Sequence, residues 1–264
     1  MININICICF DNNYFNFALN LIKSILDTTK YNKNLLYFYI LVDIGESKKI
    51  INKLNNMNIN FKEKFNFKEK FNFKVKEFNP SEKLMSLVYT QKKKYEIYHK
   101  KLISKIYYNY LNYARYYISD YFPELDKIIF LDADIELKDG IEKLYFEPFL
   151  NKYYFAAIKN GVNFKKKYAN KYQHPYLPKF KYYSKRNKHN TMTFNAGVYI
   201  TLLSKWKENN IINKLEEWIE YNNCWEHFIF SGGTQAPLNL VFCDNYEKLN
   251  NKILIHYKGY KSKR

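Results

Sequence analysis

The first 56 residues alternate between strand-like and helix-like segments, and this order restricts the chain to a small set of folds. Residues 2–10 place apolar side chains at every second position, which is the pattern of a β-strand. Residues 14–28 repeat apolar side chains at helical spacing. Residues 35–42 form a continuous apolar run, which is typical of a buried parallel strand, and residues 46–56 indicate a second helix. This succession predicts an α/β fold with a parallel sheet and right-handed crossovers.

The rest of the chain continues the alternation without a linker rich in glycine, serine or proline. With 264 residues, the chain is long enough for one large α/β domain. We therefore expect a single domain over residues 1–264, with a mostly parallel central sheet flanked by helices. Further strands are expected at residues 127–131, 153–158, 196–201 and 252–256, and further helices at residues 101–118, 204–221 and 235–242.

Three segments do not follow the alternation. Residues 61–72 contain the hexamer Phe-Lys-Glu-Lys-Phe-Asn twice, and apolar side chains at odd positions favour a long strand or hairpin over a helix. Residues 81–100 are polar and are expected to be a loop. Residues 159–188 carry ten basic side chains and no acidic one. This long loop is either a lid or acceptor surface, or a solvated loop of biased composition, and the sequence leaves both open.

The formal net charge of +18 suggests an anionic partner. The basic residues are nearly all lysines, and arginine occurs only at Arg115, Arg186 and Arg264. Asparagine is also abundant, so the charge fits a general bias in composition. A protein that reads base edges would be expected to use more arginine. We therefore expect no dedicated binding of nucleic acid.

The cysteines and the apolar runs point to a soluble protein. Cys7, Cys9, Cys224 and Cys243 are expected to be reduced and mostly packed, because two cysteines two residues apart on a strand suit no structural zinc site. No apolar run approaches the ~20 residues that a membrane span needs, and no signal-peptide pattern follows Met1. We expect a cytoplasmic location, with peripheral membrane contact and a homodimer left open.

Asp132 and Asp134 are the candidate metal ligands. They follow the apolar segment 127–131, and open α/β sheets bind ligands at the carboxyl ends of their strands. Two carboxylates there suit Mn²⁺ or Mg²⁺ bridging a diphosphate, and such an ion would neutralise charge on a departing nucleoside diphosphate. The alternative is a pair of aspartates that caps a turn, and the spacing alone does not decide between the two.

A series of ordered segments covers nearly the whole chain. They are Phe10-Asp11-Asn12-Asn13-Tyr14, Tyr113-Ala114-Arg115, Leu131-Asp132-Ala133-Asp134, Phe194-Asn195-Ala196-Gly197-Val198, Gly232 to Asn239, and His256-Tyr257-Lys258-Gly259. Together they resemble glycosyltransferase family 8, the group that contains glycogenin and bacterial lipopolysaccharide galactosyl- and glucosyltransferases. The resemblance implies a GT-A-type Rossmann-like domain. Its nucleotide-binding half would span about residues 1–135 and its acceptor and sugar half about residues 136–264.

The resemblance also implies a role for each matched residue. Asp132, Asp134 and His256 would hold the Mn²⁺ or Mg²⁺ ion. Asn195 and Gln235 would be catalytic, with Asn195 on the sugar hydroxyls and Gln235 near the anomeric carbon. Arg115 would contact the diphosphate. The full set implied for binding the UDP-sugar donor is Cys9, Asp11, Asn13, Tyr14, Arg115, Ala133, Asn195, Gly259 and Lys261.

The match departs from the family at the sugar end. The family usually reads Asp-Gln where this chain has Thr234-Gln235, and the acidic residue that often follows is Ala236. The family's terminal lysine lies six residues after the histidine, where this chain has Ser262, so Lys261 is taken in its place. The segment 243–255, in the region that often shapes the acceptor pocket, is far shorter than usual.

The leading hypothesis is a metal-dependent glycosyltransferase that retains anomeric configuration. It would transfer glucose or galactose from a UDP-sugar to a saccharide or protein acceptor, and glycogenin-like self-glucosylation stays open. The alternative is a catalytically weak or inactive nucleotide-sugar-binding homologue, which the missing carboxylates beside Gln235 favour. A nucleic-acid-binding module is the third hypothesis and rests on charge alone.

Overall fold

The central sheet of the computed structural model has the strand order β3-β2-β1-β4-β7-β6-β8. The structure describes residues 2–65, 71–99, 109–146, 153–163, 192–224, 229–242, 245–249 and 254–256. Within this sheet, as far as the described residues show, β7 runs antiparallel to both of its neighbours and the other pairs are parallel. The expected α/β fold with a mostly parallel sheet is therefore confirmed. The strands are β1 (Ile4–Cys9), β2 (Leu36–Val42), β3 (Asn72–Glu77), β4 (Lys127–Asp132), β6 (Phe155–Asn163), β7 (Met192–Leu202) and β8 (Glu247–Leu249).

Helices cover both faces of this sheet, because its strands bury side chains on both sides. In β1, Ile4, Ile6 and Ile8 belong to one hydrophobic core and Cys7 to the other. The first core packs against α1 (Phe15–Thr28), α2 (Ser47–Phe65) and α5 (Glu142–Tyr145). The second packs against α3 (Glu82–His99), η4 (Tyr110–Tyr116), α4 (Ile118–Tyr121), α7 (Leu203–Glu208), α8 (Ile211–Cys224) and α9 (Gln235–Phe242).

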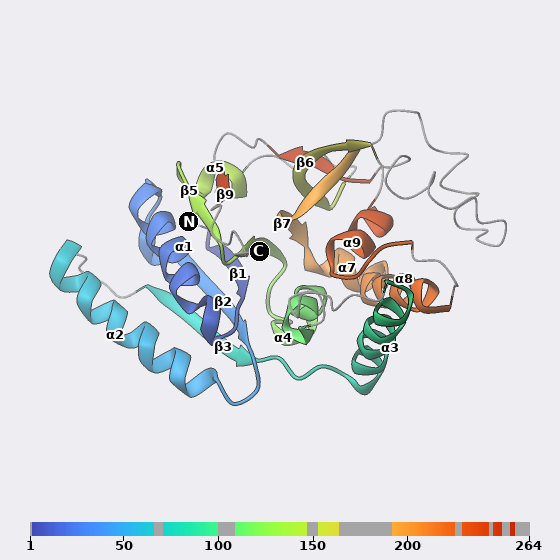
Figure 1. Ribbon diagram of the computed structural model, residues 1–264. Coiled ribbons are helices and arrows are strands. Elements are labelled where there is room, and N and C mark those ends of the chain that lie inside the picture. The colour runs from blue at the N-terminus through green and yellow to red at the C-terminus, as the bar shows by residue number, and fades with distance from the viewer. Residues whose placement is uncertain are drawn as a thin grey trace.

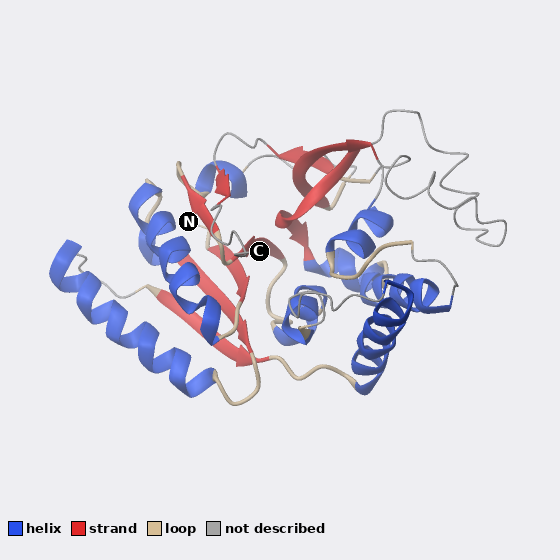
Figure 2. Ribbon diagram, viewed as in Figure 1, coloured by secondary structure: helices blue, strands red, loops and turns tan. Residues whose placement is uncertain are grey.

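The helices gather at two opposite sides of the view. Figure 1 shows α1 and α2 beside β1, β2 and β3, and α3, α7, α8 and α9 grouped on the side of β7. Figure 2 shows the strands running through the middle with helices on either flank. A separate two-stranded sheet joins β5 (Ile135–Leu137) to β9 (Leu254–His256), so residues far apart in the sequence meet there.

Most of the predicted elements are confirmed. The expected strands at 2–10, 35–42, 127–131, 153–158, 196–201 and 252–256 correspond to β1, β2, β4, β6, β7 and β9, and the helices at 14–28, 46–56 and 235–242 to α1, α2 and α9. The helix expected at 204–221 is divided into α7 and α8. Asn210 separates them with φ of 51°, a left-handed backbone angle that asparagine tolerates better than most residues.

Two predictions about local structure are wrong. Residues 81–100 are not a loop, because α3 spans Glu82–His99 and buries Leu84, Val88 and Gln91 on the face that packs against α8. Residues 61–65 are not a strand, because α2 continues through them to Phe65, and only Asn72–Glu77 pairs as β3. In α3, packing of one helix face against α8 outweighed the polar composition of the segment.

The other sequence predictions about segments are only partly covered by the described residues. In the helix expected at 101–118, residues 101–108 lie outside the described residues, and the remainder forms the 3-10 helix η4 and the start of α4. In the long loop expected at 159–188, β6 continues to Asn163 and residues 164–188 lie outside. Cys7, Cys9 and Cys224 are free thiols as expected, and Cys243 is not among the described residues. The short elements β5, β8 and α5 and the 3-10 helices η1 (Asn12–Tyr14) and η2 (Lys33–Leu35) were not predicted.

Candidate active site

The carboxyl ends of β1 and β4 meet at one edge of the sheet. The two strands are parallel neighbours, and Cys9 at the end of β1 lies in register with Asp132 at the end of β4. A cavity of about 800 Å³ opens at this edge. The predicted site residues that line it are Cys9, Asp11, Asn13, Tyr14, Arg115, Asp132, Ala133, Asp134 and Gln235. The structure therefore brings together residues that the sequence spreads over more than two hundred positions.

The turn after β1 holds its acidic side chain in place. Asp11 caps the 3-10 helix η1 (Asn12–Tyr14), because its Oδ1 accepts from the backbone N–H groups of Asn13 at 2.9 Å and Tyr14 at 3.0 Å. The Tyr14 ring packs against Phe17 of α1 with ring centroids 5.6 Å apart. This gives the wall of the cavity an aromatic face beside exposed amide and carboxylate groups.

A second carboxyl group follows β2 and lies near this turn. Burial, together with the charges of Asp11 and Glu46, raises the pKa of Asp43 above its usual value. The Glu46 carboxylate accepts from the backbone N–H of Asn12 at 2.8 Å. Asp11 after β1 and Glu46 after β2 therefore both accept hydrogen bonds from the backbone of the turn that follows β1.

Arg115 fixes the carboxylate of Asp132. Its Nη2 donates to Asp132 Oδ1 at 2.7 Å, its Nη1 donates to the carbonyl of Ala196 at 3.1 Å, and its Nε donates to the carbonyl of Asn112 at 3.1 Å. The guanidinium also lies 4.7 Å from the centre of the Phe130 ring. The side chain is 10% exposed, so the pair sits in a region where a charge-assisted hydrogen bond is strong.

The guanidinium of Arg115 keeps its positive charge. Burial lowers the pKa of Arg115, but the Asp132 carboxylate and the neighbouring phenol and thiol groups outweigh it, so the net shift is upward. The contact with a diphosphate that the resemblance implies stays a prediction. What the structure adds is that Arg115 orients Asp132, and sequence spacing gave no sign of that contact.

Gly197 leaves space for the same carboxylate. A Cβ atom at this position would lie 2.5 Å from Asp132 Oδ2 and 3.1 Å from Asn195 Oδ1, and the first of these distances is too short for any side chain. Its backbone N–H donates to Asn195 Oδ1 at 2.8 Å. The Phe-Asn-Ala-Gly-Val segment therefore holds a glycine because β7 passes directly beside Asp132.

The part of the cavity that the resemblance assigns to the sugar is built from a loop and the start of α9. Gly232 and Gly233 have φ of 125° and 78°, so the loop uses backbone angles that favour glycine. The Tyr116 hydroxyl donates to the carbonyl of Thr234 at 2.9 Å. Gln235 Oε1 accepts from the backbone N–H of Ala196 at 3.4 Å. Sequence reasoning missed Tyr116, although it stands next to Arg115.

Asn195 and Cys9 differ from the other predicted site residues, Asn195 in its position and Cys9 in its protonation. Asn195 does not line the cavity, whereas its neighbours Ala196 and Gly197 do. The thiol of Cys9 does line it, and burial, partly offset by Arg115 and reinforced by Asp132, raises its pKa to about 12. Cys9 is therefore a neutral, packed group at neutral pH and no nucleophile.

The residues around Asp132 suit a divalent cation in their chemistry. The cavity wall holds the carboxylates of Asp132 and Asp134, and hard oxygen donors are what Mn²⁺ and Mg²⁺ prefer. The backbone of His256 pairs with Ile135, the residue after Asp134, so β9 brings the third implied ligand to this corner. Within the described residues, no group of three or more His, Cys, Asp or Glu side chains is arranged to hold a metal. The side chain of His256 is not described, and Gly259 and Lys261 lie outside the described residues.

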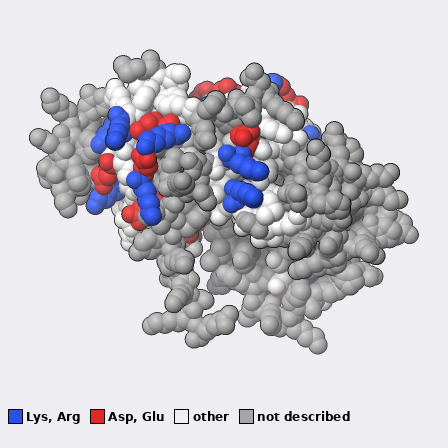
Figure 3. Space-filling view, turned by 90° about the horizontal axis from the view of Figure 1, so that it is seen from above, with Lys and Arg blue, Asp and Glu red and all other residues white. Residues whose placement is uncertain are grey.

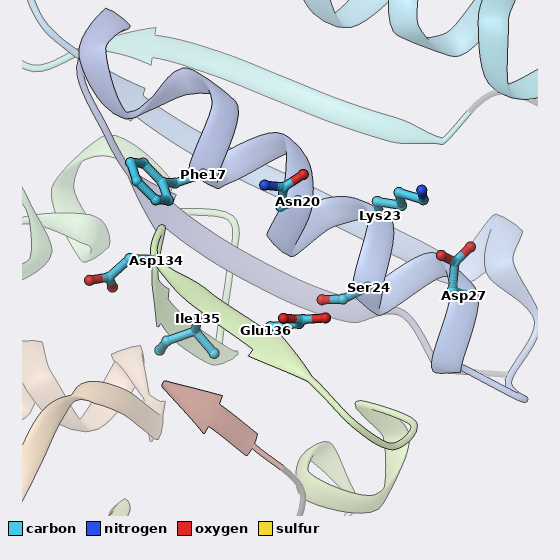
Figure 4. Close-up of a pocket in the computed structure, with 8 residues that line it drawn as sticks. All are labelled: Phe17, Asn20, Lys23, Ser24, Asp27, Asp134, Ile135 and Glu136. Atoms are coloured by element: carbon cyan, nitrogen blue, oxygen red, sulfur yellow. The ribbon is translucent and has the colours of Figure 1, made fainter. Parts of the chain in front are cut away.

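A smaller groove of about 350 Å³ continues from the cavity between α1 and β5. It shares Phe17 and Asp134 with the larger cavity. Figure 4 shows α1 side chains along one wall and β5 along the other, with the Asp134 carboxylate directed away from Asn20, Ser24 and Asp27. Asp134 therefore stands at the junction of the two spaces.

Residues 5–264 match the family model described as "Glycosyl transferase family 8". The chain belongs to glycosyltransferase family 8. Glycosyltransferase 8 domain-containing protein 1 of Xenopus laevis is 30% identical over 151 residues, which cover 53% of this chain and 42% of that protein. Probable galacturonosyltransferase-like 9 of Arabidopsis thaliana is 33% identical over 154 residues, which cover 57% of this chain and 38% of that protein. The match thus spans less than half the length of these family 8 relatives.

Solved structures confirm the GT-A fold of this family 8 chain. The galactosyltransferase LgtC, solved with donor and acceptor sugar analogues, is similar with a TM-score of 0.60 and 19% identity, covering 94% of this chain and 73% of that one. Mouse xyloside xylosyltransferase 1 gives a TM-score of 0.57 and 15% identity, covering 95% of this chain and 85% of that one. The resemblance stated from the sequence motifs is therefore confirmed for the family and for the fold.

The surface of this family 8 chain adds two observations. Seen from above in Figure 3, the basic side chains of the described residues lie among acidic ones and form no unbroken basic surface on that face. In the part of the chain that the structure describes, no helix combines the length and the apolar character that a membrane crossing requires.

Proposed function

We propose that this family 8 chain is a retaining hexosyltransferase that takes glucose or galactose from a UDP-sugar in a metal-dependent reaction. One observation carries the proposal: Arg115 holds the Asp132 carboxylate, and Gly197 leaves space for it, at the cavity where β1 and β4 end. Ligands of open α/β sheets bind at such strand ends. The acceptor is a saccharide or a protein side chain, and the cavity wall of the described residues offers carbonyl, amide and carboxylate groups for hydroxyls.

Asp132, Asp134 and His256 would hold the Mn²⁺ or Mg²⁺ ion. When bound, the ion would neutralise charge on the departing diphosphate. The residues of the chain do the remaining work in this proposal. Asp11, Asn13, Tyr14, Cys9 and Ala133 surround the nucleoside, and Arg115, Gly259 and Lys261 act on the diphosphate, Arg115 by keeping Asp132 oriented.

Gln235 and Asn195 act at the sugar. The oxygen of the Gln235 amide is directed to the Ala196 N–H, so its NH₂ is the end that would donate to a sugar oxygen. Asn195 Oδ1 accepts from Gly197, which ties the sugar end to the residue that leaves space for Asp132. Asn195, Ala196 and Gly197, three consecutive residues of β7, would thus connect the donor sugar with the metal site.

The test is binding and hydrolysis of UDP-sugars with Mn²⁺ and with EDTA. The panel includes UDP-glucose, UDP-galactose, UDP-galacturonic acid and UDP-xylose, because similar proteins are named for galacturonosyl and xylosyl transfer. We expect binding and slow hydrolysis of a UDP-hexose that Asp134→Asn abolishes. The control Asp120→Asn makes the same change of charge at an exposed residue of α4 and should leave both intact. Binding of no UDP-sugar in the presence of Mn²⁺ would sink the proposal.

A second candidate is a nucleotide-sugar-binding homologue that has weak or no transferase activity. It is favoured by the sugar end of the cavity, where Thr234 and Gln235 contribute no carboxylate to the wall. It predicts tight, metal-dependent binding of UDP without turnover over a broad acceptor panel. Measurable hydrolysis of any UDP-sugar by the wild-type chain, lost in Asp134→Asn, contradicts it.

A further inference from the structure

One segment of β7 extends beyond β4 and, among the described strands, has a partner only on its other side, where β6 pairs with Met192, Phe194 and Asn195. β4 pairs with β7 from Leu131 opposite Val198 to Lys127 opposite Leu202, so it offers no partner to residues 192–197. Side chains bond to the backbone of this segment instead. Arg115 donates to the carbonyl of Ala196, Gln235 accepts from the N–H of Ala196, and Asn239 bonds to Phe194.

Asn239 bonds to this backbone through both ends of its amide. Its Oδ1 accepts from the N–H of Phe194 at 2.8 Å, and its Nδ2 donates to the carbonyl of Phe194 at 3.0 Å. This is the pair of bonds that a neighbouring strand would make. The same Nδ2 donates to the carbonyl of Gln235 at 2.9 Å. Asn239 is 1% exposed, so losing any of these bonds would leave a buried polar group unpaired.

These bonds join the two residues that the resemblance places at the sugar. Phe194 directly precedes Asn195 in β7, and Gln235 begins α9. With the Gln235 backbone held by Asn239, the Gln235 side chain reaches the N–H of Ala196, the residue after Asn195. The amide of Asn239 thus sets how the first turn of α9 lies against β7.

We propose that Asn239 is a positioning residue that fixes Gln235 relative to Asn195 and so shapes the sugar end of the cavity. The role of that end in binding a sugar rests on the proposed function. The geometric part does not, because it concerns contacts that the chain makes without any substrate. Asn239 acts through Gln235, since it is absent from the cavity wall that the described residues form.

Asn239→Asp is the direct test. Aspartate has the same shape and still accepts from the N–H of Phe194, but it places an oxygen opposite the carbonyls of Phe194 and Gln235. Asn239→Ala is the second variant, because it removes the donor without adding a charge. Thr201→Val is the matched control on the same strand, since it removes a buried hydroxyl that donates to the Tyr154 carbonyl at 2.8 Å and accepts from Trp206 Nε1 at 2.7 Å.

Hydrogen exchange followed by mass spectrometry decides the geometric part without substrate. In both Asn239 variants we expect the amide of Ala196 to exchange on the order of tenfold faster than in wild type. Even if Thr201→Val melts at the same temperature as the Asn239 variants or at a lower one, its Ala196 amide should exchange at the wild-type rate. An unchanged rate in the Asn239 variants, or an equal rise in Thr201→Val, overturns the proposal.

Turnover decides whether this geometry serves the sugar. In Asn239→Asp we expect kcat for hydrolysis of the UDP-hexose to fall by about tenfold or more, with the Kd for UDP within twofold, because positioning contributes to rate through alignment. The nucleotide end is built on β1, η1 and β4, which Asn239 does not touch. A kcat that stays within twofold of wild type overturns the proposal. If wild type hydrolyses no donor, the proposed function fails and the exchange rates alone decide the role of Asn239.

Discussion

Replacing Gly197 tests the proposed metal site without replacing any of its ligands. In Gly197→Ala the new methyl group would lie 2.5 Å from Asp132 Oδ2, so either the carboxylate turns away or β7 shifts. We expect the affinity for Mn²⁺ in the presence of UDP to fall by about tenfold to a hundredfold, roughly the loss seen when a supporting contact of a metal ligand is removed. Isothermal titration of Mn²⁺ into the UDP-bound chain measures it.

Gly45→Ala provides the control for this prediction. Gly45 has φ of 81° and nothing within 4 Å of an added Cβ, so alanine strains the backbone there and meets no neighbour. We expect this variant to lose stability by about 1 kcal/mol and to keep its Mn²⁺ affinity. Equal Mn²⁺ affinity in Gly197→Ala and wild type would show that the contact with Asp132 has no part in metal binding.

At the level of single residues, the sequence identified side chains but not their contacts. Asp132, Gln235 and Arg115 were found because each stands in an ordered motif. The bond between Arg115 and Asp132 joins residues 17 positions apart on different elements, and only the fold brings them together. Asn239 lay inside a recognised segment, but its partner Phe194 is 45 residues away. Roles that depend on a distant backbone group leave no local pattern to read.

The start of α2 offers a prediction at the level of elements. Glu77 lies at the end of β3. Its carboxylate accepts from the backbone N–H of Ser47 at 3.1 Å and from the Ser47 hydroxyl at 2.6 Å, so it caps α2, the helix that follows the neighbouring strand β2. The hydroxyl of Ser47 and the backbone N–H groups of Gly45 and Ser47 lower the pKa of Glu77 below its ordinary value of 4.5. A carboxylate with a lowered pKa stabilises the fold above the unfolded pKa, and that contribution is lost as the pH falls through the folded pKa.

Glu77→Gln should therefore melt below wild type at pH 7, and the two curves should converge as the pH falls below about 4. Thermal melts from pH 7 to pH 3 measure this. The variant Ser47→Ala removes one donor of the cap, so in that background the effect of Glu77→Gln should shrink. A difference between Glu77→Gln and wild type that is constant over the whole pH range contradicts the assignment.

Elements were predictable where one face of a helix or strand is strongly apolar. The strands β1, β2 and β4 are such cases, because almost every position is buried on one face or the other. The helix α3 was missed because its buried face is narrow, at Leu84, Val88 and Gln91, while apolar side chains such as Tyr89 and Ile97 are exposed and blur the helical period. The pairing of β5 with β9 could not be read either, since it joins a three-residue strand from the middle of the chain to one near its C-terminus.

The whole molecule is expected to respond to its ligands as a unit. The cavity wall takes residues from β1, η1 and β4 on one side and from β7, the Gly232–Gly233 loop and α9 on the other. A ligand that contacts both sides stabilises the folded state by RT ln(1 + [L]/Kd), which is about 2.7 kcal/mol at a hundred times Kd. For a chain of this size that corresponds to a rise in Tm of roughly 5–10 °C. Differential scanning calorimetry with UDP and Mn²⁺ together should show this rise.

Each component alone should give a smaller shift, because the diphosphate and the cation would share the Asp132 and Asp134 corner and neutralise each other's charge. The Asp134→Asn variant should lose the additional shift that Mn²⁺ gives in the presence of UDP, while Asp120→Asn should keep it. This comparison tests coupling between the ends of the cavity, since Asp134 lies on β4's side and the stabilised unit includes α9. A shift with UDP and EDTA as large as that with UDP and Mn²⁺ would mean that nucleotide binding needs no cation, and the metal site proposed here would have to be abandoned.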